Sequence, residues 1–287
     1  MSKRLGINKV IRLTGKYVPK WGYTSFSFLF KVWVNFQKSG GLTCCSSLSY
    51  TLLLAFIPFS ISMASISTWL PISNSLINDV QIYFFSKFIP QSGHQIYDLF
   101  RLSFKHSSRL SILGLLSLLG TCYGMMFTVE QHIHQMWHIK RQRSLIKSLL
   151  LFTCFFIGGP LLVYTIALGV EFLQVIIQNE EINLMLAMLA GNLVTLLSFI
   201  LIYKFLPSKE VRWKHAIGAG SLAGFAFACL QAYFSYSMRH LQEEYYLLYG
   251  SLAMLPVFLL WLYLSVLILL VGAQIIYVIE LTPLRRR

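Results

Sequence analysis

Six long apolar stretches constrain this chain more than any other feature of its sequence. They cover roughly residues 43–69, 111–129, 147–170, 182–203, 216–237 and 253–279. Each approaches or exceeds the about 20 apolar residues that a helix needs to cross the hydrocarbon core of a bilayer. With 56% hydrophobic residues overall, the chain has too little polar surface for a soluble domain. The sequence therefore predicts an all-α membrane protein with six transmembrane helices.

Charge is divided unequally among the seven segments outside these stretches. Counted with Lys147 at the start of the third stretch, the first, third, fifth and seventh segments hold 19 of the 24 Lys and Arg residues, with three acidic residues. The second, fourth and sixth hold five basic and seven acidic residues. Because cytoplasmic loops of membrane proteins carry the excess of Lys and Arg, we expect both termini in the cytoplasm. The same charge predicts contact with anionic headgroups, and we expect no binding of nucleic acid.

Further helices are predicted outside the six spans. Residues 21–38 carry an apolar stripe at helical spacing between lysines, which is typical of a helix lying in the inner interface, and Gly40-Gly41 would end it. Two short outer helices are expected within residues 70–110. We therefore divide the chain into a basic cytoplasmic segment (1–42), one transmembrane domain (43–280) and a basic tail (281–287).

Three of the predicted spans contain an interior proline, namely Pro58, Pro160 and Pro256. A proline inside a helix removes one backbone donor and frees the carbonyl four residues earlier, and lipid offers no partner for it. Two interpretations stay open. The broken helices line a cavity, as in many transporters, or the prolines only kink the helices.

Small residues recur at every fourth position of the fifth stretch, at Ala216, Gly220, Gly224 and Ala228. Gly120 and Gly124 repeat this spacing in the second stretch. Such a row allows another helix to approach closely, which favours helix association in lipid. The pattern predicts tight packing and no chemistry.

One group of side chains at the end of the second stretch has the residue types of a metal site. If the helix continues, Glu130, His134 and His138 share one face, with His132 nearby, and could offer three ligands to a divalent ion. The alternative is that these histidines are simply tolerated at the membrane interface. We expect no resident metal and no cofactor, because no nucleotide-binding or hydrolase motif is present.

Several short motifs resemble those of the BrkB/YihY-type bacterial inner-membrane proteins, once labelled ribonuclease BN. They are Gly41-Leu42-Thr43, Ser49–Leu53, Ile57-Pro58, Val211-Arg212-Trp213, Tyr249–Ala253, Leu260–Tyr263 and Gly272-Ala273. The resemblance covers about residues 25–280 and implies a six-helix protein of the bacterial inner membrane whose biochemical activity is not established. The family commonly has Glu after the Gly-Ala pair, where this chain has Gln274.

The leading functional hypothesis is a non-enzymatic protein that moves or binds a small or lipid-like molecule. Its candidate positions are Pro58, Pro160, Tyr249, Gly250, Ser251, Pro256, Trp261, Tyr263, Gly272 and Gln274. The alternative is a structural or assembly protein of the envelope that docks through the helices of residues 70–110. Ribonuclease activity is least expected, because a metal-dependent nuclease needs several clustered carboxylates or histidines, and the basic face has three scattered carboxylates.

Overall fold

The structure is a computed structural model that describes residues 20–67, 112–139, 143–177, 179–249 and 254–281. Within these ranges the chain forms helices and the turns between them, with no strand. The predicted all-α class is therefore confirmed. The predicted outer helices of residues 70–110 and the basic tail after residue 281 lie outside the described residues.

Each of the six apolar stretches corresponds to one helix. The helices are α2 (Lys20–Lys38), α3 (Gly41–Ser67), α6 (Ile112–Met136), α7 (Leu145–Ile176), α8 (Glu180–Phe205), α9 (Trp213–Tyr249) and α10 (Met254–Ile276), followed by a π-helical turn, η3 (Tyr277–Leu281). Among the described residues, four segments are long and apolar enough to cross a membrane, and they lie in α7, α8, α9 and α10. The chain therefore has the helices of a membrane protein.

Helix α9 extends well past the predicted end of the fifth span at residue 237. The sequence analysis placed a loop there because Arg239, Glu243 and Glu244 interrupt the apolar run. Charged residues end a membrane span without ending a helix, and the chain has no Gly or Pro between Phe225 and Tyr249. The helix continues to Tyr249, the last described residue before residues 250–253.

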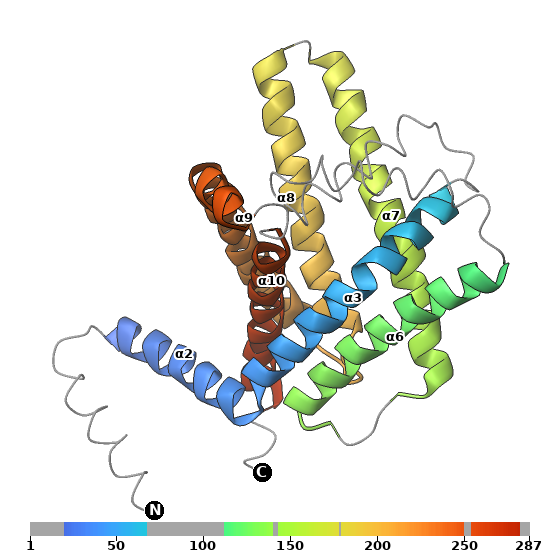
Figure 1. The fold of residues 1–287 in the computed structure, drawn as a ribbon. Coiled ribbons are helices and arrows are strands. Elements are labelled where there is room, and N and C mark those ends of the chain that lie inside the picture. Colours follow the sequence, from blue (N-terminus) through green and yellow to red (C-terminus); the bar gives the residue numbers. More distant parts are fainter. Residues whose placement is uncertain (1–19, 68–111, 140–142, 178, 250–253, 282–287) are drawn as a thin grey trace, which may run out of the picture.

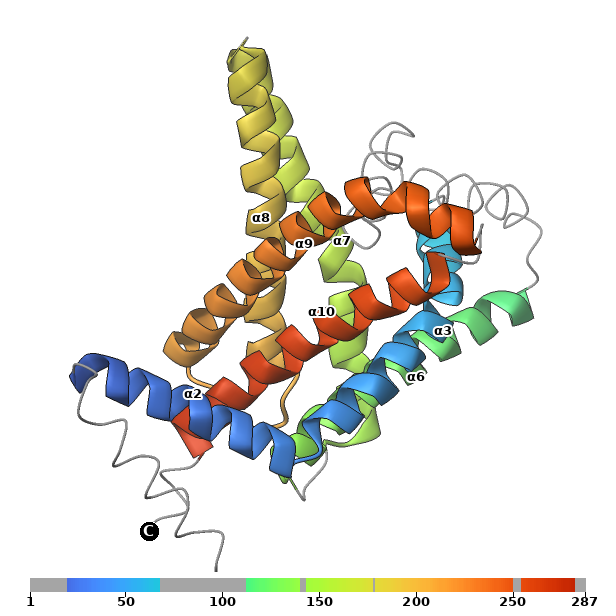
Figure 2. The same cartoon turned by 60° about the vertical axis from the view of Figure 1, so that its left-hand side comes forward.

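Helix α10 occupies the centre of the arrangement. Helices α3 and α9 both pack on it, α6 pairs with α3, α8 pairs with α9, and α7 packs on α8 (Figures 1 and 2). Half of the most apolar window of α10 is buried, against 6% of that of α7. The far ends of α7 and α8 stand apart as a hairpin (Figure 2). Their exposed apolar side chains are suited to contact with lipid.

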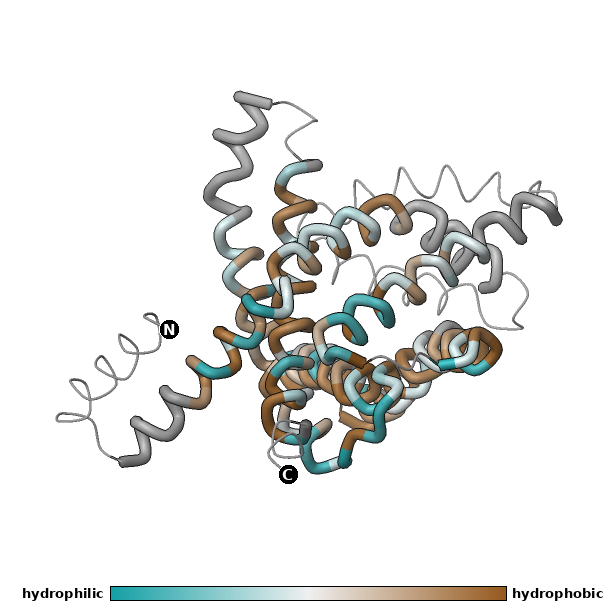
Figure 3. Tube along the Cα trace, turned by 90° about the horizontal axis from the view of Figure 1, so that it is seen from below, coloured by the Kyte–Doolittle hydropathy of each residue, from teal (hydrophilic) through white to brown (hydrophobic). Residues whose placement is uncertain are grey.

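One end of the molecule collects the turns that the sequence analysis assigned to the basic side. The α2–α3 turn, the end of α6, the start of α7, the loop of residues 206–212 between α8 and α9, and η3 all lie there, at the bottom of Figure 1. We call this the basal end. Figure 3 views it from below, where hydrophilic residues gather in the turns and hydrophobic residues run along the helices.

The turn between α2 and α3 needs both of its glycines. Gly40 has a φ of 71°, a left-handed conformation that favours glycine, and its N–H donates to the Gln37 carbonyl at 3.1 Å. A Cβ on Gly41 would lie 2.5 Å from the ring of Phe36, which is fully buried. The predicted end of the first helix at this glycine pair is confirmed.

Close packing through small residues occurs on α9. A Cβ on Gly220 would lie 2.5 Å from Cγ1 and 2.9 Å from Cα of Ile200 on α8, and a Cβ on Gly224 would lie 3.2 Å from Cα of Leu196. The prediction is thus confirmed for the fifth stretch. For Gly120 and Gly124 the described residues show no such packing, since none of their atoms lies within 4 Å of an added Cβ. Spacing alone does not determine which face of a helix meets a neighbour.

Candidate functional site

The predicted site residues do not converge on one place. Helices α3 and α7 run without interruption through Pro58 and Pro160, and Tyr249 is the last residue of α9. Gly250 and Ser251 lie outside the described residues. Pro256 is the third residue of α10 (Met254–Ile276), next to residues 250–253, which lie outside the described residues, so the expected break at Pro256 stays a prediction.

Two of the candidates, Trp261 and Gly272, face α8 and α9 from one side of α10. Trp261 is 1% exposed, and its ring centroid lies 5.5 Å from that of Phe227 and 4.9 Å from that of Phe234, both on α9. Gly272 follows Trp261 by eleven residues, or about three turns, and so lies on the same side of α10. Because Gly272 has no side chain, Tyr203 of α8 fills the space beside it. The Tyr203 hydroxyl donates to the Leu269 carbonyl at 2.9 Å. These contacts are packing contacts between helices.

Gln274 lies on the other side of α10. It follows Gly272 by two residues, about 200° around the helix, and so faces away from α8. Its exposed fraction is 0%, and neither its Oε1 nor its Nε2 has a hydrogen-bond partner among the described residues. Each such buried polar group costs about 1–3 kcal/mol. Among the candidate positions whose side chains the structure describes, this amide is the one with buried polar atoms that lack a partner.

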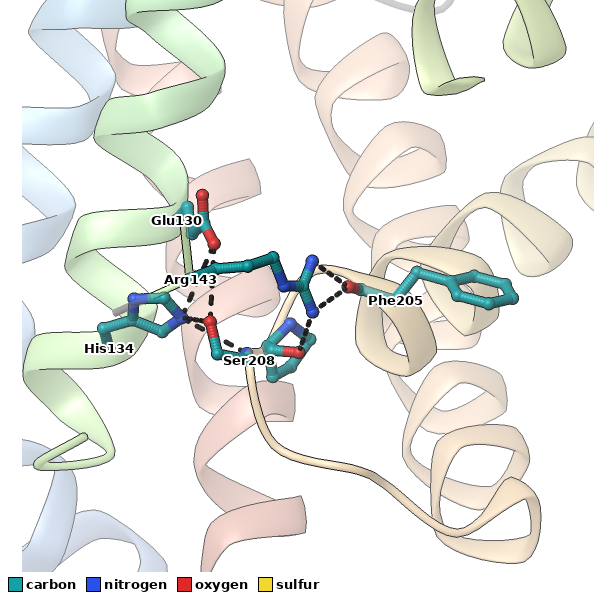
Figure 4. A network of polar contacts seen from close by, with 6 residues as sticks. Glu130, His134, Arg143, Phe205 and Ser208 are labelled. Carbon is teal, nitrogen blue, oxygen red and sulfur yellow. Dashed lines mark hydrogen bonds and ion pairs between the residues drawn. The ribbon is translucent and has the colours of Figure 1, made fainter. Parts of the chain in front are cut away.

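A second polar site, which the sequence analysis treated only as a metal candidate, lies at the basal end. Glu130 and His134 of α6 are 2% and 3% exposed and face Ser208 in the α8–α9 loop (Figure 4). His134 Nε2 lies 2.7 Å from Ser208 Oγ, 3.2 Å from Ser208 N and 3.8 Å from Glu130 Oε1. Glu130 Oε2 is buried and has no partner among the described residues. We call Glu130, His134 and Ser208 the basal cluster.

The hydrogen bonds of the basal cluster define the protonation state of His134. The Ser208 N–H donates to Nε2, which can accept only when that nitrogen carries no proton. His134 is therefore neutral, with its proton on Nδ1. Burial lowers the pKa of His134, Glu130 opposes this shift, and the positive charge of Arg143 adds to it. The pKa and the hydrogen bonds thus agree on a neutral imidazole near neutral pH.

The three predicted metal ligands do not meet, and this hypothesis is wrong. Helix α6 ends at Met136, and His138 follows in a left-handed conformation with a φ of 51°. The Ile139 N–H donates to the His134 carbonyl and the His138 N–H to the Gln135 carbonyl, which is the Schellman arrangement. The His138 ring packs on Tyr277 instead, at 6.4 Å between centroids.

The other ligand groups nearby do not replace His138. His132 Nδ1 lies 2.7 Å from its own helix's Thr128 carbonyl, and among the described residues no group of three His, Cys, Asp or Glu side chains is placed to hold a metal ion. The basal cluster also differs from a hydrolase triad. Glu130 and Ser208 both approach Nε2, whereas a triad has its carboxylate on Nδ1.

The loop of residues 206–212 receives polar contacts from several elements. Arg143, just before α7, donates to the Phe205 carbonyl at 3.3 Å and the Pro207 carbonyl at 3.0 Å, and so caps the end of α8 (Figure 4). At the other end of the loop, the Arg212 N–H donates to Glu280 Oε1 of η3 at 3.1 Å. A carboxylate at this position stabilises the N-terminus of α9.

Sequence reasoning missed the role of this loop, although a signal was present. The basic side has three acidic residues, and two of them, Glu130 and Glu280, contact the α8–α9 loop or the start of α9. An acidic side chain within a strongly basic segment indicates a specific contact with another group of the chain. The partners themselves are distant in sequence, so only the fold reveals them.

These features can now be compared with known proteins. Residues 32–286 match the family described as virulence factor BrkB. The chain belongs to the BrkB family. This confirms the resemblance that its motifs indicated. No solved structure matches the chain.

Relatives with the name UPF0761 membrane protein agree with this assignment. Those of Chromohalobacter salexigens and Psychrobacter sp. are 29% and 30% identical over 84% and 93% of this chain. That of Haemophilus influenzae is 27% identical over 88% of it. The chain spans 60% and 51% of the length of the first two and 93% of the third. The names identify membrane proteins and state no activity.

Proposed function

We propose that this BrkB family protein crosses the bacterial inner membrane six times and binds or moves a small or lipid-like molecule, without enzymatic chemistry or a cofactor. Both ends of the chain lie in the cytoplasm, and the basal end faces the anionic headgroups of the inner leaflet. The observation that carries the proposal is the fully buried, unpartnered amide of Gln274 in the central helix.

The buried position of the Gln274 amide is costly in free energy. Native interiors pair nearly all buried polar side-chain atoms, so an exception calls for an explanation. Gln274 lies in α10, which packs on α3 and on α9. Helix α3 in turn pairs with α6, and α9 pairs with α8. A shift of α10 against its neighbours would open this side of the helix. The amide would then gain a partner from a polar group of a bound molecule.

The placement in the membrane is supported by the surface and by the basal end. Two basic segments, the one between α6 and α7 and the one between α8 and α9, lie together at the basal end (Figure 1). A chain that crosses the membrane at each stretch requires this arrangement. Large apolar side chains on α7, α8 and α9 are well exposed, with Phe172 at 69%, Met185 at 66% and Phe225 at 70%. Lipid removes the cost of exposing them to water. Helix α2, with Trp33 exposed, lies in the inner interface.

The proposal is tested by measuring what the purified protein retains. The protein and its Gln274→Leu variant are extracted from the same cells into detergent, and the bound small molecules and lipids are compared by native mass spectrometry. Loss of a hydrogen bond of about 1.4 kcal/mol predicts about tenfold less of one retained species in the variant. Gln131→Leu, at an exposed position of α6, is the matched control and retains it.

Two outcomes contradict the proposal. In the first, the protein retains no species beyond bulk lipid. In the second, Gln274→Leu and Gln131→Leu retain the same species in the same amounts. Thermal unfolding of each variant is measured alongside, so that a misfolded variant is recognised.

A further inference from the structure

Ser208 joins the α8–α9 loop to α6 mainly through one nitrogen of His134. Both its backbone N–H, at 3.2 Å, and its hydroxyl, at 2.7 Å, approach His134 Nε2, and the hydroxyl also lies 3.5 Å from Glu130 Oε1. Nε2 has a single lone pair when neutral, and it has none to offer when protonated. The bond from the loop backbone to α6 therefore depends on the presence or absence of one proton.

We propose that the basal cluster is a proton-operated clasp, which holds the α8–α9 loop to α6 while His134 is neutral and releases it when His134 is protonated. Protonated Nε2 cannot accept from the Ser208 N–H and becomes a donor. Glu130 Oε1 lies 3.8 Å away, and Glu130 Oε2 has no other partner among the described residues, so this carboxylate is placed to receive the imidazolium. Protonation thus exchanges a contact between elements for one within α6.

The charged groups around the cluster favour this exchange. Arg143 approaches from the segment before α7 and is held by the Phe205 and Pro207 carbonyls. Helices α3 and α10, which also pack near α6, carry no charged residue. Lys147, Lys209 and Glu210, which α7 and the loop contribute, are exposed to solvent. Glu130 is therefore the buried acceptor for a protonated His134.

The direction of the pH dependence follows from burial. The pKa of His134 lies below its ordinary value of 6.5, mainly because the ring is buried. The unfolded or released state therefore binds a proton more readily than the clasped state. The stability that the clasp contributes is fully present above pH 6.5 and is lost as the pH falls through the lowered pKa. Between pH 6.5 and the lowered pKa each pH unit weakens the clasp by at most about tenfold, and below the lowered pKa there is no further loss.

Release of the loop is local, because its other end has a separate anchor. The Arg212 N–H is bound to Glu280, and His215 Nδ1 lies 3.4 Å from the same carboxylate. The clasp thus frees the loop at Ser208, while Arg143 still holds the Pro207 carbonyl, Lys204 still holds the Val211 carbonyl and the start of α9 stays in place. This behaviour does not depend on which molecule the membrane domain binds.

The test is hydrogen exchange of the full-length protein in nanodiscs, followed by mass spectrometry of peptides that cover residues 206–212. Exchange is measured from pH 8 to pH 5 and corrected for the intrinsic rate at each pH. Protection of the Ser208 amide should fall by at most about tenfold for each pH unit below pH 6.5 and should level off below the lowered pKa of His134. No loss of protection over this range overturns the proposal.

Three variants assign the proton. In His134→Gln the pH transition should disappear, because a glutamine oxygen accepts at every pH. In His132→Gln, the matched control, it should remain, since His132 contacts only the Thr128 carbonyl of its own helix. Glu130→Gln should move the midpoint to lower pH, because Glu130 raises the pKa of His134.

Each variant also has a result that refutes the clasp. A transition that persists in His134→Gln assigns the proton to another group. A midpoint that stays unchanged or rises in Glu130→Gln shows that this carboxylate does not receive the charge. If His134→Gln fails to fold, the Glu130→Gln midpoint decides the question by itself.

Discussion

The contact of Gly220 with α8 allows a quantitative test of the helix packing. In Gly220→Ala the new methyl would lie 2.5 Å from Ile200 Cγ1, 2.9 Å from its Cα and 3.0 Å from its N. Carbon atoms pack at about 3.5–4.0 Å, so α8 and α9 must separate by roughly 1 Å. Backbone atoms cannot turn aside as a side-chain terminus can, and overpacking of this kind costs about 1–3 kcal/mol.

A matched control lies two residues earlier on the same helix. Gly218 is exposed and has nothing within 4 Å of an added Cβ. Gly218→Ala should therefore only gain helix propensity, worth up to about 1 kcal/mol. Gly220→Ala gains the same propensity but loses packing. We expect the two variants to differ by about 1–3 kcal/mol in the free energy of unfolding, with Gly218→Ala the more stable.

The assay is unfolding in mixed micelles with increasing dodecyl sulfate, followed by the fluorescence of the six Trp residues. Adding Ile200→Ala to Gly220→Ala removes Cγ1 but leaves the backbone, so it should restore part of the loss. Equal stability of the two glycine variants within about 0.5 kcal/mol would refute the close approach of α8 and α9.

Other contacts give further expected outcomes. Gly272→Ala should destabilise the protein by about 1–3 kcal/mol, because the new methyl overlaps Tyr203. Adding Tyr203→Phe should restore part of this loss, which a double-mutant cycle of melting curves would measure. Trp137→Phe should lose about 1 kcal/mol in chemical unfolding, because it removes the bond from Nε1 to the Ala273 carbonyl at 3.2 Å. Gln274→Leu should raise the unfolding free energy by about 1–3 kcal/mol, and a loss of stability would show that the amide has a partner.

The sequence predicted the elements of this fold better than their ends. Apolar length located the helices, and the glycine pair at Gly40 located the turn after α2. The end of α9 was missed because charged residues were treated as a helix end. The end of α6 was missed because His138 takes a left-handed conformation more typical of glycine. Helix termini depend on local backbone conformation, which hydropathy does not report.

The site was predicted less well for a different reason. Trp261, Gly272 and Gln274 were chosen from one motif, yet helical geometry places Gln274 opposite the other two. In the basal cluster, His134 was singled out, but its partner Ser208 lies 74 residues away in the sequence. Contacts between separate helices depend on rotation and register, and a single sequence contains little information on either.

The central claim is that the chain crosses the membrane six times, with its loops on alternate sides. The cytoplasmic placement of the basal end and the proposed binding of a molecule depend on it. Its most direct measurement is a pair of reporter fusions, alkaline phosphatase and green fluorescent protein, placed after Glu181 and after Lys209. We expect phosphatase activity without fluorescence at Glu181 and fluorescence without phosphatase activity at Lys209. The same sidedness at both positions would contradict the account.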